Sequence, residues 1–254
     1  MPRSIWNGTI SFGLVHVPIK LYSATESKTV RFSEVHAKDG AKIEHKRICS
    51  KEDKEVPYDE VVKGFEVAPE EYVVLDKDEI KAAAGARGKV VEIEEFVPAD
   101  EIDPAFFERT YYVGCRDDGE AYRVLQVALE STGRAGIGRF TFHNREYLTA
   151  VRALDGVLAL HTMRFHDEVV RGDELDVGTP GKGPTKPEVE MAARLVESMH
   201  RDFDPTEYAD TYRQAVLDMI ERKASGEEIE APEEEPQEEI SDLLAALEAS
   251  VKGG

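Results

Sequence analysis

A compact basic cluster lies at residues 38–47. Its cations are Lys38, Lys42, Lys46 and Arg47, with His45 among them. Between Ala41 and Arg47 the one acid is Glu44. Ammonium and guanidinium groups at this density suit phosphate and other anions. The cluster therefore indicates an anion-binding surface, although a solvated hairpin would show the same residues.

A second basic group follows an alternating pattern near the middle of the chain. In the stretch GRAGIGRFTFHNREYLTAVR, Phe140 and Phe142 share one face of a predicted strand, and Arg139 lies on the other face. Arg134 and Arg145 flank this strand. The pattern fits an ordinary solvated sheet face, but with the 38–47 cluster it also favours a polyanion-binding surface.

Net charge and charge distribution give different indications. The chain has 254 residues and a formal net charge of −20, which by itself argues against a nucleic-acid partner. The acid is concentrated, however: residues 49–108 carry 7 basic and 18 acidic side chains, and residues 227–254 carry 1 and 10. Residues 1–48 carry 8 and 4. Such segregation is typical of a protein with one anion-binding face.

The sequence contains no recognisable motif for catalysis, metal binding or cofactor binding. GTPGKGPT lacks the Gly-Lys-Ser/Thr order of a phosphate loop, so it is interpreted as part of a linker. The histidines lack metal-ligand spacing, and Cys49 has no nearby second cysteine for zinc. We therefore expect no catalytic residue, no metal and no cofactor. Two unpaired cysteines and the lack of a long apolar run predict a reducing, cytoplasmic setting without a signal peptide or membrane span.

The first half of the chain is predicted to be mainly strands. TISFGLVHVPIKLY alternates with a period of two, and Pro18 is expected at an edge or at the break between two strands. Asp39-Gly40 predicts a hairpin with Lys38 and Lys42 at its tip. Further strands are expected at EEYVVLD and KVVEIEEFV, with a helical start at KDEIKAAA between them.

The second half combines a helix, a strand meander and a helical end. GEAYRVLQVALESTG predicts an amphipathic helix, with Tyr122, Leu125, Ala128 and Leu129 on one face. Three strands follow, joined by turns at 143–146 and at Asp155-Gly156, and many hairpin-joined strands favour a barrel or sandwich. Gly138, in the sequence GIG, is expected to ease a barrel bend.

Two amphipathic helices are expected after the linker at 172–187. The apolar stripe of the first runs from Val189 to Phe203, and the second is predicted to begin at the N-cap Asp204 with Pro205. An acidic, Pro-containing segment then leads to a short terminal helix, and the stripe of that helix is Ile240, Leu243, Leu244, Leu247 and Val251. This helix is too short to be stable alone, so it docks back on the chain or binds a partner groove.

Taken at length, the sequence resembles the bacterial Ku family. The similarity runs in order through SIWNGTISFGLVHVPIKLYSAT, VRFSEVHAKDG, VPYDEVVKGFE, IEEFVPADEIDPAFFERTYYV, AYRVLQVALESTGRAGIGRF and MAARLVESMHRDFDPTEYADTYRQAVLDMIERKASG. The resemblance implies a mixed α and β fold: a β-barrel core with a strand-built arch, a helical arm and a flexible acidic tail. On this basis the core spans 1–171 with the arch at about 30–70, the linker 172–187, the arm 188–226, and the tether with its helix 227–254.

The resemblance also implies a function and partners. A ring-shaped homodimer would bind double-stranded DNA ends in non-homologous end joining, protect them, and recruit an ATP-dependent multifunctional repair ligase. It would act without catalysis, in the nucleoid-associated cytoplasm. The predicted DNA contacts are Lys20, Lys38, Lys42, Lys46, Arg47, Arg134, Arg139 and Arg145. The predicted ligase-docking residues are Leu243, Leu244, Leu247 and Val251. Two alternatives remain: an acidic scaffold for protein partners, and a hydrolase or nuclease.

Overall fold

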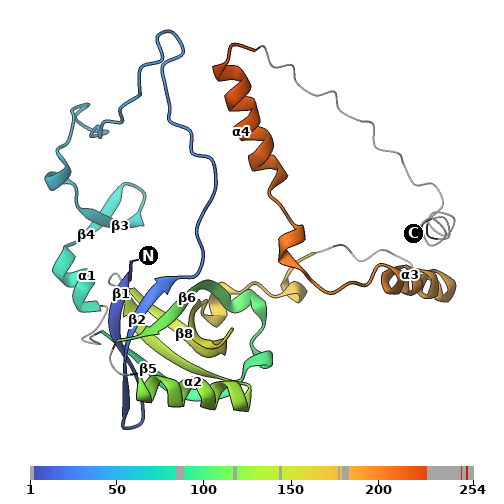
Figure 1. Cartoon of the computed structure of the whole chain (residues 1–254). Coiled ribbons are helices and arrows are strands. Elements are labelled where there is room, and N and C mark those ends of the chain that lie inside the picture. The colour runs from blue at the N-terminus through green and yellow to red at the C-terminus, as the bar shows by residue number, and fades with distance from the viewer. Residues whose placement is uncertain are drawn as a thin grey trace. The chain divides into compact units, whose positions relative to one another are not determined.

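The computed structural model of the chain (Figure 1) describes residues 3–83, 89–116, 119–142, 145–176, 178, 183–227, 247 and 250. The chain divides into two compact units. The first consists of Met1–Ser27 with Glu34–Glu174, and the second of Lys28–Ser33 with Leu175–Gly254. The change of unit at Glu174 falls within the segment 172–187.

A closed barrel forms the centre of the first unit. Its strands are β1 (Trp6–Phe12), β2 (Val15–Ser23), β5 (Val90–Pro98), β6 (Phe107–Cys115), β7 (Arg134–Phe142), β8 (Arg145–Leu154) and β9 (Val157–Met163). Around the barrel their order is β1-β2-β6-β9-β8-β7-β5, and a parallel pairing of β1 with β5 closes it. Closure pairs all the strands and leaves no open sheet edge.

The barrel interior is filled by alternate residues of its strands. Val17, Ile19 and Leu21 of β2 are almost fully buried, while the side chains between them lie toward the outer face. The Trp6 and Phe140 rings meet edge to face, with centroids 5.6 Å apart. A Val, Leu, Ile or Phe side chain contributes about 1.5–3 kcal/mol when fully buried. The alternation of apolar and polar residues along the strands therefore sets both the fold and much of its stability.

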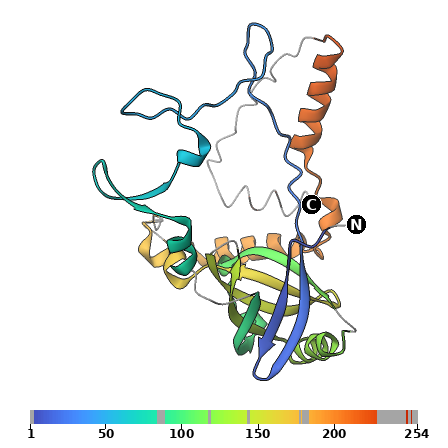
Figure 2. The same cartoon turned by 90° about the vertical axis from the view of Figure 1, so that its left-hand side faces the viewer.

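Helix α2 (Glu120–Thr132) covers one end of the barrel (Figures 1 and 2). Leu125 and Leu129 are buried against the strand side chains, as predicted, whereas Ala128 is exposed and Gln126 is buried in its place. The Tyr122 hydroxyl donates to the Val113 carbonyl at 2.7 Å and accepts from the Leu158 amide at 2.9 Å. These bonds tie the helix to strands β6 and β9.

The meander β7–β9 has the predicted antiparallel order, with Asp155 and Gly156 at positive φ in the turn between β8 and β9. Residues 143 and 144 of the other predicted turn lie outside the described residues.

The surroundings of Gly138 support the expectation that it eases a bend of the barrel. A Cβ atom there would lie 2.0 Å from the Glu92 carbonyl oxygen, opposite a register shift between Ile93 and Glu95. The backbones therefore approach closely because position 138 has no side chain.

The prediction for Pro18 is wrong about the break between strands. The break is at Gly13, which has a φ of 57°, and Pro18 lies inside β2 opposite Thr9. Pairing of β2 with β6 begins only at Ile19. Toward β6, Pro18 contributes its carbonyl, which accepts from the Arg116 amide at 3.2 Å. A residue without an N–H is tolerated at this point because no ladder bond toward β6 requires one.

The connection between β2 and β5 holds a small ribbon and a short helix. The ribbon pairs β3 (Lys63–Ala68) with β4 (Glu71–Leu75), and α1 (Lys77–Ala83) follows. The apolar side chains of this ribbon are exposed: Phe65 by 68%, Tyr72 by 57% and Val74 by 55%. A two-stranded ribbon with uncovered apolar faces is marginal alone in water.

The second unit contains α3 (Lys186–Ser198) and α4 (Thr211–Ala224). Thr185 and Glu188 form a capping box at the start of α3, and hydrogen bonds from Thr185 lower the pKa of Glu188.

The predicted start of the next helix at Asp204 is wrong. Asp204 caps only a single turn, Pro205–Glu207, and α4 begins after Asp210, whose carboxylate accepts from the Arg213 amide. Asp204 and Asp210 offer the same kind of local cap, so the sequence signal is ambiguous.

Short 3-10 helices occupy Tyr58–Glu60, Ala99–Glu101, Pro104–Phe106, His166–Glu168 and Gly172–Glu174. None of the described helices is both long and apolar enough to span a bilayer.

Candidate nucleic-acid interface

The turn predicted at Asp39-Gly40 is present. Gly40 has a φ of 70°, and the His36 amide donates to the Ala41 carbonyl at 2.7 Å. Asp39 Oδ1 accepts from the Ala41 amide at 3.1 Å and lies 3.0 Å from His36 Nδ1. The flanking residues, however, form only an isolated bridge between Val35 and Lys42, so the predicted hairpin lacks regular strands.

A second turn follows that the sequence analysis missed. The Val56 amide donates to the Arg47 carbonyl and the Cys49 amide to the Lys54 carbonyl, both at 2.8 Å. Asp53 has a φ of 52° within this turn. The polar run from Ser50 to Lys54 is the sequence signal that could have located it.

Acids from both turns contact the basic cluster: Glu55 from the second turn and Glu34 from across the first. Lys46 Nζ donates to Glu55 Oε2 at 2.7 Å, and this hydrogen bond raises the pKa of Lys46. His45 Nε2 lies 2.8 Å from Glu34 Oε2. Arg47 lies over the Tyr58 ring, 4.9 Å from its centroid. Lys46 and Arg47, both predicted to contact DNA, and the neighbouring His45 therefore already have contacts within the chain.

Lys38 and Lys42 differ from the rest of the cluster. Both are exposed, and neither forms an ion pair within the part of the chain that the structure describes. Lys38 lies inside the Asp39-Gly40 turn, and Lys42 follows it directly. The structured turn thus presents two ammonium groups to solvent.

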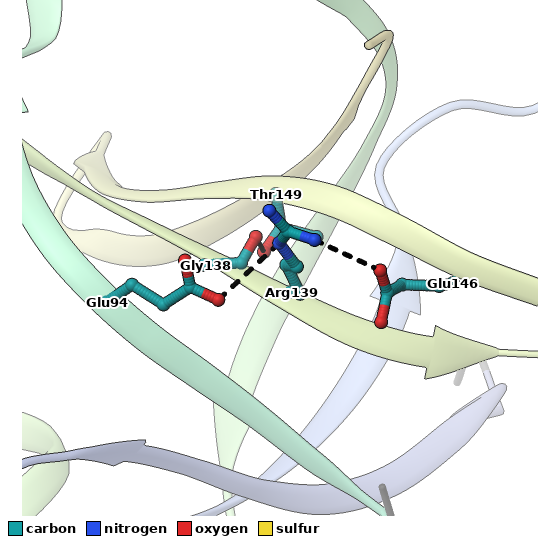
Figure 3. Close-up of polar contacts among 5 residues, drawn as sticks. All are labelled: Glu94, Gly138, Arg139, Glu146 and Thr149. Atoms are coloured by element: carbon teal, nitrogen blue, oxygen red, sulfur yellow. Dashed lines mark hydrogen bonds and ion pairs between the residues drawn. The ribbon is translucent and has the colours of Figure 1, made fainter. Parts of the chain in front are cut away.

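Arg139 lies between two carboxylates on the outer face of the barrel (Figure 3). Its Nη1 donates to Glu146 Oε1 at 3.3 Å, and its Nε lies 3.5 Å from Glu94 Oε1. The side chain is 40% exposed. Beneath it, the Thr149 hydroxyl donates to the Gly138 carbonyl at 3.1 Å, which links β8 to β7. The charge of Arg139 is therefore largely offset by residues of β5 and β8.

The predicted barrel contacts do not form one patch. Arg134 begins β7 beside the end of α2, and its Nη1 donates to the Phe96 carbonyl at 3.5 Å. Arg145 lies at the opposite end of that hairpin, paired in register with Phe142, and contacts Glu168 at 3.3 Å. Lys20 lies on β2, and further strands separate β2 from β7 in both directions around the barrel. These cations consequently face different directions.

Arg109 is a candidate that the sequence analysis missed. Together with Arg145 it lines a cavity of about 810 Å³ in the first unit. Its sequence signal is alternation: Arg109 precedes Tyr111 and Val113, the inward-facing residues of β6.

His161 is buried on β9 among polar groups of neighbouring strands. The Arg152 Nε donates to His161 Nε2 at 3.0 Å, and His161 Nδ1 lies 2.9 Å from the Thr110 hydroxyl. Burial and then the nearby Arg152 charge lower the pKa of His161 to about 4. His161 is therefore neutral at pH 7 and acts as a cross-strand connector. No group of metal-ligating side chains occurs among the described residues.

Comparison with known proteins identifies the barrel. Residues 11–192 match the model of the Ku70/Ku80 beta-barrel domain. The chain belongs to the Ku family. It is 45% identical to a protein of Anaeromyxobacter sp. (strain K) named non-homologous end joining protein Ku, over 99% of this chain and 86% of that protein.

Other Ku relatives agree over nearly the whole chain. A Mycobacterium tuberculosis Ku (strain CDC 1551 / Oshkosh) is 38% identical over 98% of this chain and 95% of its own length. The Ku of Bacillus subtilis (strain 168) is 36% identical over 98% and 81%. The predicted membership of the bacterial Ku proteins and the predicted Ku barrel are confirmed. The match includes the β2–β5 connection, so the basic cluster at 38–47 and both turns beside it belong to the Ku domain.

Proposed function

We propose that this Ku chain binds the ends of double-stranded DNA in non-homologous end joining, without catalysis and without reading the sequence. Two copies form a ring that admits a duplex from its end, protects the end and recruits an ATP-dependent multifunctional repair ligase. The chain works in the cytoplasm at the nucleoid. The division into core, linker, arm and tether at 1–171, 172–187, 188–226 and 227–254 belongs to the same proposal.

One observation carries the DNA part of the proposal. The Ku domain contains a long connection between β2 and β5 in which a structured turn presents Lys38 and Lys42 without an ion-pair partner in the described residues. Ammonium groups bind phosphate as point charges and do not distinguish bases. A ring that must slide onto any broken end requires contacts of this kind.

The remaining candidates require an exchange of partners. Lys46, Arg139 and Arg145 each have a carboxylate within 3.5 Å, and each of these pairs is partly exposed. Exposed ion pairs contribute only about 0–1 kcal/mol, so a DNA phosphate can displace the acid at small cost. The acids thereby tune affinity without preventing binding.

The acidity of the chain fits such a ring. With a net charge of −20, most of the surface repels DNA, and the acid is concentrated outside residues 1–48. DNA contacts with parts of the surface away from the basic cluster at 38–47 are therefore unfavourable. We infer that this arrangement limits non-specific association with duplex sides.

Exposed apolar side chains support assembly of two copies. Phe65, Tyr72 and Val74 on the β3–β4 ribbon and, in the second unit, Phe203 and Tyr212 are more than half exposed in a single copy. Large exposed apolar surfaces mark interaction sites. We propose that a second copy covers the ribbon.

We infer that the ligase contact lies in the segment 240–251, for which the sequence predicts a helix. Leu247 is helical and half-buried. Leu243, Leu244 and Val251 lie outside the described residues. The spacing of these apolar residues is that of a helix bound in a groove, and on this basis we propose that they dock on the ligase.

Linear and circular DNA of equal length and sequence distinguish a ring from an acidic scaffold. The ring binds the linear duplex, fails on the closed circle, and fails when both ends carry bulky caps. Equal binding to circle and line, or binding to neither, would contradict the proposal. Incubation of the same DNA with divalent metal tests the nuclease alternative, and we expect intact DNA.

A further inference from the structure

The end of the barrel away from α2 holds a cavity of about 810 Å³, here called the barrel mouth. Its lining includes Arg109, Tyr111, Phe142, Arg145, Tyr147 and Thr162. A volume of this size lies in the range of small-molecule sites, and α2 leaves this end uncovered.

Strand register directs two arginines into the mouth. Arg109 of β6 pairs with Thr162 of β9, and residues 111 and 113 beyond it are buried inside the barrel. Arg145 begins β8, followed on the same face by Tyr147 and by the fully buried Thr149. Because side chains alternate along a strand, both guanidinium groups lie on the interior face, on strands that flank β9.

The acids near the mouth already have donors. Glu108 Oε2 accepts from the Thr162 hydroxyl at 3.4 Å. Glu168 accepts from Arg145 at 3.3 Å and from the Phe165 amide at 2.8 Å. Arg109 forms no ion pair within the described chain; its contact is the Tyr111 hydroxyl, whose pKa is raised because burial outweighs the effect of Arg109.

Aromatic rings lie beneath the arginines. The Arg145 guanidinium lies 5.2 Å from the Tyr147 ring centroid. Tyr111 and Phe142 meet edge to face with centroids 6.5 Å apart. Guanidinium groups above partly exposed rings form the combination that binds a nucleotide, with phosphate on the arginines and the base against a ring.

We propose that the barrel mouth binds one unpaired nucleotide at the end of a DNA strand. The phosphate of that nucleotide contacts Arg109 and Arg145, and its base packs against Tyr147 or Phe142. This inference rests on the proposed function and adds to it a preference for ends with an unpaired nucleotide. A free mononucleotide carries the same groups, so the test compares the two sources.

The test uses the full chain and two linear duplexes of equal length. One is blunt, and the other has a single-nucleotide 3′ overhang of 2-aminopurine. Affinity is measured by anisotropy, with and without free deoxynucleotide as competitor. Entry of the base into the mouth is measured by quenching of its fluorescence. The variants are Arg109→Gln and Arg145→Gln, with Arg109→Lys to retain charge. Arg116→Gln, at the end of β6 away from the mouth, is the matched control.

The expected result is specific to the overhang. Both glutamine variants should lose about 10-fold in affinity for the overhang duplex and lose the quenching. Arg109→Gln should bind the blunt duplex within 2-fold of wild type. Arg145→Gln, at a residue also proposed to contact phosphate, should weaken binding of the blunt duplex less than binding of the overhang duplex. The Arg116→Gln control should bind both duplexes as wild type does. Arg109→Lys should retain part of the overhang affinity, which shows that the loss does not arise from misfolding.

Three results would overturn the inference. Equal weakening on both duplexes would make the arginines general phosphate contacts. Unchanged overhang binding in both glutamine variants would leave the mouth without a role in DNA binding. Competition by free deoxynucleotide that depends on Arg109, without quenching of the overhang base, would assign the mouth to a free nucleotide. Failure of wild-type protein to bind the blunt duplex would instead contradict the proposed function.

Discussion

Lys46 Nζ donates a 2.7 Å hydrogen bond to Glu55, so the charge of the basic cluster at 38–47 is partly neutralised within the chain itself. The pair joins the two sides of the second turn, across the bridge between Ile48 and Glu55. The phosphate contact proposed for Lys46 would therefore compete with an internal acid.

Removal of that acid should strengthen DNA binding. In Glu55→Gln, Lys46 does not have to break an ion pair before it contacts a phosphate. We therefore expect a two- to five-fold gain in affinity for linear duplex, which corresponds to the loss of an exposed ion pair worth about 0–1 kcal/mol. Glu52→Gln removes the same charge from the same turn, at a residue without an ion pair in the described structure, and is the control. Equal gains in both variants would show that net charge matters and the Lys46 pair does not.

Affinity should depend steeply on salt. A ring that contacts roughly 6–10 phosphates should lose about 10³–10⁵-fold in affinity between 50 and 200 mM salt, because bound counterions are released from the DNA. Titrations on two unrelated sequences of equal length measure this, and the curves should coincide. A flat response would count against a phosphate-lined ring.

Substitution of Arg139 should affect both stability and binding. In Arg139→Gln, Glu94 and Glu146 lose their shared cation, and we expect a loss of about 1 kcal/mol in the free energy of unfolding. If Arg139 also contacts phosphate, affinity should fall by a similar factor on every duplex and the salt slope should decrease by about 1. Urea unfolding and salt titration separate the two effects.

The double variant Arg139→Gln with Glu146→Gln provides the control. It should recover part of the stability without recovering DNA affinity. A variant that unfolds earlier but binds DNA with unchanged affinity and slope would make Arg139 purely structural.

The His161 contact predicts a loss of stability in acid. The pKa of this residue is about 4 in the folded chain against an ordinary 6.5, so the unfolded chain takes up the proton first as pH falls. Its contribution is complete above about pH 6.5 and is lost progressively toward pH 4. We expect a loss on the order of 2 kcal/mol over this window.

Unfolding of wild type and His161→Gln between pH 7.5 and 4 isolates this effect. The variant should be less stable at neutral pH and show a shallower decline. His200→Gln, at an exposed residue of the second unit, should follow wild type. Parallel curves for wild type and His161→Gln would refute a lowered pKa at His161.

Truncation after Gly226 should separate DNA binding from ligase recruitment. The removed segment carries 1 basic and 10 acidic side chains and the stripe from Ile240 to Val251. We expect DNA affinity and dimerisation to remain nearly unchanged and ligase stimulation to be lost. Leu244→Asp with Leu247→Asp should have the same effect in the full chain. Full stimulation by the truncated protein would place the docking site on residues 188–226.

The local elements of this protein were predictable because their signals are local. Period-two alternation located β1, β2 and the meander, and the amphipathic pattern ending at Gly133 located α2. The turns at Asp39-Gly40 and Asp155-Gly156 required only short-range chemistry. Ku membership followed from the order of these segments along nearly the whole chain.

What surrounds each charged side chain was decided only by the tertiary structure. Barrel closure placed Glu94 of β5 beside Arg139 of β7 and directed Arg109 and Arg145 into one cavity. Register and closure depend on pairing between strands far apart in the sequence, and a shift of one residue would turn each of these side chains to the opposite face. The sequence therefore determined which residues are cations, and the fold decided which of them remain available to a phosphate.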